Sequence, residues 1–403
     1  MPFEVWHIHH TVYCIFFEFS KKKQHFMGGY MSKVFLKGVL TAFLGAVLTC
    51  GSAFAADTIK IGVPGAHSGE LASYGLPTLN AVNLVADEYN AKGGILGKQV
   101  EVIAFDDACK AEIATNAATK LISDGVVGVI GHICSPAGKA AMPLYNNAKV
   151  ISISGSITSP AMTLSGENPY FFRTVANDTA SAIVGAGYVI NNLKAKKVAI
   201  LHDNSEYGKG YAEQAADYLK KNSDIEIVLF EAITPGAADY SSVIRKVRRV
   251  DADVLMWGGY YPEASKLLSN MNSLDAVIPM IGPDGLKDLG FVELAGADAE
   301  NVYASGPTDT SSNPVSKYYA EKHMAKYGST PGAFFDNAVS AALALMNAIE
   351  KAGTTDSAKV IDALHKEEIE TAVGSIHFDE HGDAVGVGMS IYQIQNGQYV
   401  EMK

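Results

Sequence analysis

The stretch Val129-Ile130-Gly131-His132-Ile133-Cys134-Ser135 decides the fold class, because an apolar segment ends there in a small polar loop just before Pro136. The segment Asp106-Asp107-Ala108-Cys109 ends the preceding predicted strand in the same way. Proline is favoured in the first turn of a helix, so a strand, a loop and a helix follow one another. Open α/β sheets bind small molecules at such loops. These two loops are therefore the first candidates for a binding site.

Residues 31–55 have the features of a secretory signal. Lys33 and Lys37 precede the apolar run 39–48, and Ala53-Phe54-Ala55 forms a cleavage site of the A-x-A type. The apolar run is about half the roughly 20 residues that a membrane-spanning helix needs. We therefore expect cleavage after Ala55 and release into the periplasm.

Two features of the N-terminal region stay open. Residues 1–30 fit no export signal, and we interpret them as an upstream extension without a function, since Met27 or Met31 is a more natural translation start. Lipidation of Cys50 is an alternative to release, although Thr49 stands where such signals usually carry a small residue.

The chain contains four cysteines, of which Cys14 and Cys50 precede the predicted cleavage site. Cys109 and Cys134 remain in the exported part. In an oxidising compartment two such cysteines are expected to form a disulfide. The alternative is a pair of buried free thiols.

The charge of the chain argues against a nucleic-acid partner. Lys and Arg number 32 and Asp and Glu 43, which gives a formal net charge of −11. A phosphate backbone attracts the opposite sign. The local basic run Arg245, Lys246, Arg248 and Arg249 is interpreted as the solvated face of a helix.

Short apolar strands alternate with amphipathic helices along most of the chain, which predicts parallel βαβ units. The alternation restarts midway, so two similar halves are expected in a chain long enough to divide into two domains. A final antiparallel hairpin is predicted at Asn396-Gly397. The predicted strands are 59–63, 100–105, 126–130 and 150–153, then 198–201, 225–230, 254–257 and 278–281.

The common motifs of enzymes are missing from the sequence. It has no phosphate-binding glycine loop, no G-x-S-x-G elbow and no H-E-x-x-H zinc helix. His132 and Ser135 stand three residues apart, but no orienting acid or oxyanion device accompanies them. We interpret His132 as a packed strand residue, and we expect no catalytic residue, metal or cofactor.

Nearly the whole exported part resembles the periplasmic leucine/isoleucine/valine-binding proteins that serve ABC transporters. The resemblance rests on the order and spacing of short segments, none of which is diagnostic alone. They are Ala72-Ser73-Tyr74-Gly75, Asn90-Ala91-Lys92-Gly93-Gly94-Ile95, the two loops already quoted, His202-Asp203, Tyr207-Gly208, Gly258-Gly259-Tyr260-Tyr261-Pro262-Glu263, Gly282-Pro283-Asp284-Gly285 and Gly332-Ala333-Phe334.

The resemblance implies a type I periplasmic binding fold, an α/β flytrap in which two doubly wound parallel-sheet domains are joined by three crossings. Domain 1 would comprise residues 56–177 and 308–386, and domain 2 residues 178–307 and 387–403. A monomer with its ligand between the domains is expected.

The resemblance also assigns the ligand-binding residues. From domain 1, Ser135, Ser156 and Thr158 would hold the α-carboxylate and ammonium of an amino acid. Tyr207, Tyr260 and Asp284 would close over it from domain 2, and Tyr74 and Phe334 would enclose its side chain. The chain departs from the family where Ser156 replaces a frequent alanine and Asp284 replaces the usual glutamate.

The chemistry of these residues suits an amino acid. Ser135 before Pro136 and Thr158 before Ser159-Pro160 are expected at helix N-termini, where a carboxylate finds hydroxyl and N–H donors. Asp284 would neutralise the ammonium. The alternative is that these side chains only cap helices.

The expected function is therefore a periplasmic receptor that captures an aliphatic L-amino acid and delivers it to an inner-membrane ABC permease. Two alternatives are kept. One is a sensory or transport receptor for another small amino acid, amide or acid, and the other is a secreted hydrolase that uses Ser135.

Overall fold

The computed structural model describes residues 57–402. The predicted signal peptide, the upstream extension and Cys50 lie outside the described residues. Among residues 57–402, none of the helices combines the length and the apolar character of a membrane span.

Five parallel strands form the first sheet, in the spatial order β2-β1-β3-β4-β5. Four of them match the predicted strands. Their bounds are β1 (Ile59–Gly65), β2 (Val100–Asp106), β3 (Gly128–Ile130), β4 (Ile151–Ser154) and β5 (Phe171–Arg173).

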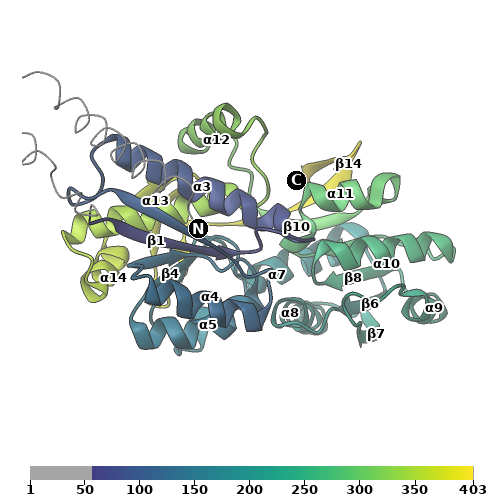
Figure 1. Ribbon diagram of the computed structural model, residues 1–403. Coiled ribbons are helices and arrows are strands. Elements are labelled where there is room, and N and C mark those ends of the chain that lie inside the picture. The colour runs from purple at the N-terminus through teal and green to yellow at the C-terminus, as the bar shows by residue number, and fades with distance from the viewer. Residues whose placement is uncertain (1–56, 403) are drawn as a thin grey trace, which may run out of the picture. The chain divides into compact units, whose positions relative to one another are not determined.

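Helices cover both faces of the first sheet. On one face lie α3 (Ala72–Ala91) and α13 (Phe335–Ala352), and on the other lie α4 (Ala111–Ser123) and α5 (Ser135–Ala148) (Figure 1). The buried side chains of α13 include Leu345, Met346 and Ile349, which pack against the strands. The central strands β1, β3 and β4 are almost wholly buried, which requires such double cover. We call this sheet and its helices the first lobe.

The second sheet has seven strands in the order β15-β14-β10-β9-β8-β6-β7. Strands β10 to β7 are parallel, whereas β14 and β15 are antiparallel. The bounds are β6 (Lys197–His202), β7 (Glu226–Ala232), β8 (Val254–Gly258), β9 (Met280–Gly282), β10 (Tyr303–Pro307), β14 (Met389–Gln395) and β15 (Gln398–Met402).

The predicted hairpin is confirmed. Asn396 and Gly397 join β14 to β15 with φ angles of 53° and 72°. Two positive φ angles are the requirement of a tight two-residue hairpin turn, and asparagine and glycine meet it at the least cost.

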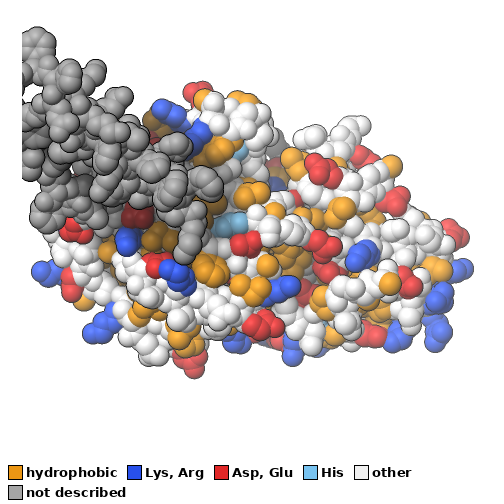
Figure 2. Space-filling view, viewed as in Figure 1, with side chains coloured by type: hydrophobic (Ala, Val, Ile, Leu, Met, Phe, Trp, Pro, Cys, Tyr) orange, Lys and Arg blue, Asp and Glu red, His pale blue; other side chains and the backbone are white. Residues whose placement is uncertain are grey.

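Helices also cover both faces of the second sheet, which with them forms the second lobe. One face carries α7 (Asp178–Tyr188) and α8 (Glu206–Asn222). The other carries α9 (Ser241–Arg249), α10 (Tyr261–Ser273) and α11 (Leu289–Ala295). The basic run on α9 is exposed, and its Lys246 pairs with Glu231 at 2.5 Å. On the face shown in Figure 2, Lys and Arg side chains are scattered among Asp and Glu side chains.

The chain passes between the two sheets three times, at residues 174–177, 308–313 and 386–388. Between the second and third crossings it returns to the first lobe. There it forms α12 (Pro314–Tyr327), α13, α14 (Ser357–Lys366) and a small sheet of β11 (Ile369–Thr371), β12 (Gly374–Phe378) and β13 (Ala384–Val385).

Arg173, at the end of β5, is fully buried and joins three segments of the first lobe. Its Nε atom donates to Asp383 Oδ1 at 2.6 Å, just before β13, and its Nη1 atom donates to the carbonyl oxygen of Ser159 at 2.8 Å. Nη2 donates to the Thr163 hydroxyl. The guanidinium therefore holds the loop after β4 to the strand that leads into the third crossing.

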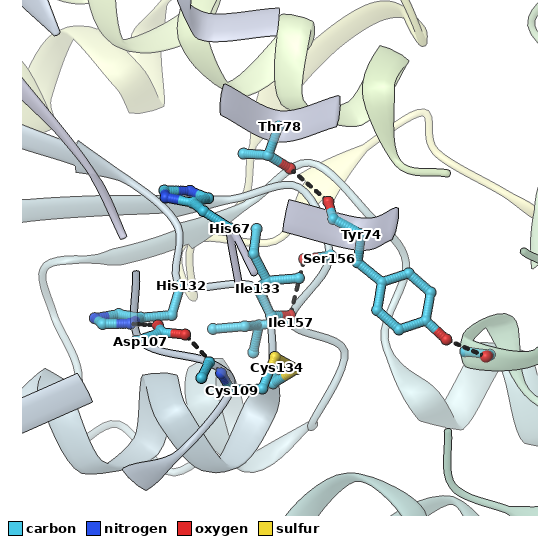
Figure 3. The surroundings of a disulfide bond; sticks show 12 residues. His67, Tyr74, Thr78, Asp107, Cys109, His132, Ile133, Cys134, Ser156 and Ile157 are labelled. Carbon is cyan, nitrogen blue, oxygen red and sulfur yellow. Dashed lines mark hydrogen bonds and ion pairs between the residues drawn. A yellow bond between two sulfur atoms is a disulfide. The ribbon is translucent and has the colours of Figure 1, made fainter. Parts of the chain in front are cut away.

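The predicted disulfide is confirmed, because Cys109 and Cys134 are bonded with their Cα atoms 5.4 Å apart. Asp107 supports the loop of Cys109. Its Oδ1 atom accepts from the Cys109 N–H at 2.8 Å, and its Oδ2 atom lies 2.5 Å from His132 Nδ1 on the other loop (Figure 3). The bond and the buried Asp107–His132 pair thus connect the ends of β2 and β3.

A row of serines holds the loop after β3. The hydroxyls of Ser152, Ser154 and Ser156 donate to the carbonyl oxygens of Gly131, His132 and Ile133, at 2.6, 2.7 and 2.9 Å. Figure 3 shows the Ser156 hydroxyl directed at Ile133. Buried carbonyls beyond the end of a strand require such partners.

Replacing Cys109 and Cys134 together by serine is expected to lower the free energy of unfolding by about 3 kcal/mol, since the bond restricts the unfolded chain. Urea denaturation measures this loss. Thiol titration of denatured, unreduced protein that starts after Ala55 is the companion measurement, and two reactive thiols per chain would contradict the disulfide.

Ser154→Ala is expected to lower the free energy of unfolding by about 1–3 kcal/mol, because buried groups lose their partner. The Ser154 hydroxyl also accepts from the N–H groups of Ser156 and Ile157. Urea denaturation is compared with Ser273→Ala on the exposed surface of α10. Equal losses for the two variants would show that the serine row adds nothing to stability.

Candidate functional site

A pocket lies between the two lobes, at the carboxyl ends of strands in both sheets. It encloses about 270 Å³, including its opening to solvent. All the predicted ligand residues except Thr158 line it. The lining residues are Tyr74, Ile133, Cys134, Ser135, Ser156 and Phe334 from the first lobe, and Tyr207, Tyr260, Asp284 and Gly285 from the second.

Ser135 is the first residue of α5 and is buried. The N-cap position belongs to Cys134, and no side chain caps this helix end. The Ser135 hydroxyl accepts a 3.4 Å hydrogen bond from the Ser159 N–H, which leaves its own proton available. A hydroxyl donor and the free N–H groups of a helix N-terminus suit a carboxylate.

Ser156 lines the pocket, and its hydroxyl donates to the Ile133 carbonyl oxygen at 2.9 Å, which leaves the hydroxyl oxygen able to accept from a ligand. The expectation that Thr158 lies at a helix N-terminus was wrong, because the four-residue helix α6 (Ala161–Leu164) begins three residues later. Thr158 is instead fully buried, and its hydroxyl has no hydrogen-bond partner among the described residues.

Asp284 begins the short helix η3 (Asp284–Leu286) directly after β9 and is 1% exposed. Its Oδ1 atom accepts from the Tyr207 hydroxyl at 2.6 Å and from the Gly285 N–H at 3.1 Å. Its Oδ2 atom has no partner among the described groups. Burial raises the pKa of this carboxyl. One oxygen is thus held by the protein and the other remains available to a cation.

Asp178 is a candidate that the sequence did not reveal. It follows Asn177, whose side chain caps α7, so the segment resembles an ordinary helix start. Asp178 is nevertheless fully buried, and neither carboxylate oxygen has a hydrogen-bond partner of normal geometry in residues 57–402. Burial raises the pKa of its carboxyl well above the usual range, and the charge of Asp284 raises it further.

Aromatic rings form the remaining wall. The Tyr260 ring lies 5.0 Å from that of Tyr207 and 6.3 Å from that of Tyr74, and the Phe334 ring lies 5.9 Å from that of Tyr74. The Tyr74 hydroxyl donates to the carbonyl oxygen of Gly285, and this hydrogen bond spans the two lobes. The two lobes are therefore closed over the pocket, whose walls combine apolar ring faces with polar groups.

His132 does not serve as a base for Ser135. Its Nδ1 atom contacts Asp107 and its Nε2 atom contacts the Tyr145 hydroxyl at 3.1 Å, and both partners are buried. Since both ring nitrogens are engaged, the histidine stabilises the loop and does not activate Ser135 as a nucleophile. His132 is packed as expected, but the expectation of a strand was wrong, because β3 ends at Ile130 and His132 lies in the loop that follows.

Known proteins of similar sequence are amino-acid-binding proteins. A relative from Pseudomonas aeruginosa, a leucine-, isoleucine-, valine-, threonine- and alanine-binding protein, is 32% identical over 84% of this chain and 90% of its own. The Leu/Ile/Val-binding protein of Citrobacter freundii is 30% identical over 84% and 91%.

A solved structure also matches. The branched-chain amino acid transporter substrate-binding protein LivJ from Streptococcus pneumoniae, in complex with isoleucine, has a TM-score of 0.77 and 30% identity. The match covers 86% of this chain and all of that one. The family model described as periplasmic binding protein matches residues 58–398. With two doubly wound sheets, three crossings and a pocket between them, the chain belongs to the periplasmic binding protein family.

Proposed function

We propose that this protein is an exported receptor that captures an aliphatic L-amino acid between its lobes and delivers it to an ABC permease. The observation that carries the proposal is the polarity of one small pocket. A helix N-terminus with Ser135 lies in one wall, and the unpartnered oxygen of Asp284 lies in the other.

This polarity complements a zwitterion. The α-carboxylate would accept from the Ser135 hydroxyl and from N–H groups at the start of α5. The ammonium would donate to Asp284 and to the Thr158 hydroxyl, with Asp178 behind them. Burying an ammonium without a counter-charge costs free energy. The carboxylates therefore select for ligands that carry an ammonium group.

The walls of the pocket support an aliphatic side chain. Tyr74, Tyr260 and Phe334 present ring surfaces. The relatives named above bind leucine, isoleucine and valine, and one of them also threonine and alanine, which is the class that we propose here.

Two positions of the pocket also suit a receptor for a related class of ligand. Asp284 is one methylene shorter than the glutamate usual at this position, and Ser156 adds a hydroxyl to the opposite wall. A receptor for another small amino acid, amide or acid would use the same fold. Neighbouring genes for two permeases and two ATPases would favour transport over sensing.

We propose that residues 31–55 are removed, that the protein acts in the periplasm as a monomer, and that it turns over no substrate. The domains would comprise 56–177 with 308–386 and 178–307 with 387–403. The engagement of both His132 nitrogens supports the absence of hydrolase chemistry.

Calorimetric titration of the protein with the twenty amino acids is expected to show binding confined to small and branched aliphatic L-amino acids. Co-purified ligand must first be removed by unfolding and refolding. Binding of acidic, basic or aromatic amino acids alone would contradict the proposed class, as would binding of none.

Asp284→Asn is expected to weaken amino-acid binding by well over tenfold, because it removes the counter-charge of a buried ammonium. Calorimetry measures the affinity, and the melting temperature reports folding. Asp288→Asn, four residues later on the same segment, is the matched control, since Asp288 caps α11. Equal affinities for the wild type and Asp284→Asn would leave Asp284 without a role in binding.

A further inference from the structure

Asp178 and Asp284 are two buried carboxyl groups of the same region, and burial and the negative charge of Asp284 raise the pKa of Asp178. They are 0% and 1% exposed. In the described part of the chain, three of their four carboxylate oxygens have no hydrogen-bond partner of normal geometry, although the nearby Thr158 hydroxyl lowers the pKa of Asp178. The fourth is held by Tyr207 and by the Gly285 N–H.

Arg173 lowers the pKa of Asp178 and Lys287 lowers that of Asp284, but in the described part of the chain neither cation forms an ion pair with these carboxylates. The donors of Arg173 are engaged with Asp383, with Thr163 and with two backbone carbonyls, and Lys287 holds its ammonium 4.1 Å from the centroid of the Tyr392 ring. Glu206 adds a further negative charge to the surroundings of Asp178. The titratable groups that face the pair are Arg173 from β5, Glu206, Tyr207 and Tyr211 from α8, Tyr260 before α10, and Lys287 after η3.

Both aspartates belong to the second lobe, because α7 packs against α8 and β14, and η3 follows β9. Their cover comes partly from the first lobe. Thr158 accepts from the Asp178 N–H at 2.8 Å through its carbonyl oxygen, and Tyr74 reaches the carbonyl oxygen of Gly285. Separating the lobes at the crossings would remove this cover and return water to the carboxylates.

Resting on the function proposed above, we propose that these two carboxylates control closure: the lobes close only when one positive charge is added beside Asp284, close to Asp178. The ammonium of an amino acid supplies this charge. In its absence a proton does the same, so acid closes the protein without ligand. Two carboxylates that share a dry site cannot both stay ionised, which is why one added charge suffices.

The direction of the pH effect follows from burial. Burial raises the pKa of both carboxyl groups, so the closed form binds a proton more tightly than the open, hydrated form. Closure without ligand is therefore favoured at low pH and is lost as the pH rises through the raised pKa values. A proton and an ammonium compete for one place, so amino-acid affinity falls in acid, by at most tenfold per pH unit for one proton.

Small-angle scattering without amino acid tests the proposal directly. At pH 7.5 the wild type is expected to have a larger radius of gyration than at pH 5. The double variant Asp178→Asn/Asp284→Asn is expected to have the smaller radius at both values, because it carries no charge to neutralise. Asp217→Asn/Asp362→Asn is the matched control, since it removes the same net charge from two exposed positions and should behave as the wild type.

Either of two scattering results would overturn the proposal: a wild-type radius that does not change with pH, or a double variant that stays open. Circular dichroism melting checks that the variant folds. These measurements contain no ligand, so they can fail while amino acids still bind and close the wild type at pH 7.5. In that case the proposed function stands and the control of closure by charge is wrong.

Calorimetry of the wild type supplies a second test that needs no variant. Titration of leucine at pH 5 in two buffers with different protonation enthalpies is expected to show release of up to one proton per ligand, and release at pH 8 should be close to zero. Equal heats in the two buffers at pH 5 would contradict proton displacement. If leucine does not bind at pH 8 either, the proposed ligand class is wrong instead.

Discussion

Three consecutive carbonyl groups, those of Gly131, His132 and Ile133, must find hydrogen-bond donors beyond the end of β3, and the pocket depends on how they do so. Ser152, Ser154 and Ser156 supply one hydroxyl each. Because this row fixes the loop backbone, Cys134 can bond to Cys109 and α5 can begin at Ser135, which lines the pocket. The loop is thus part of the rigid first lobe rather than a flexible connection.

Much of the fold could be predicted because its signals are local. Apolar runs separated by amphipathic segments identified the strands, and Asn396-Gly397 identified the hairpin, since few residues tolerate two successive positive φ angles. The disulfide followed from composition and compartment. The ladder of serines was visible as the alternation Ile151-Ser152-Ile153-Ser154, although only the structure shows which carbonyls it meets.

The site could be predicted only in part, because burial depends on elements that are distant in the sequence. Thr158 was expected at a helix N-terminus, but its carbonyl oxygen accepts a hydrogen bond from the Asp178 N–H. The sequence presents Asp178 as an ordinary helix start. Tyr207 and Asp284 are 77 positions apart, and their hydrogen bond exists only because β6 and β9 both neighbour β8. Local patterns contain no information on such contacts.

The contacts of Arg173 determine which segments of the first lobe move together. Its guanidinium binds the loop of Thr158 and Ser159 to Asp383, immediately before the chain leaves the first lobe for the last time. A displacement of either segment would strip buried donors of their acceptors, so the two must move together. The first lobe therefore has no hinge between the loop of Ser159 and the segment of Asp383 that leads into the third crossing. Bending of the molecule is therefore left to the short crossings, and a displacement of the loop of Ser159 would rotate the first lobe as a whole.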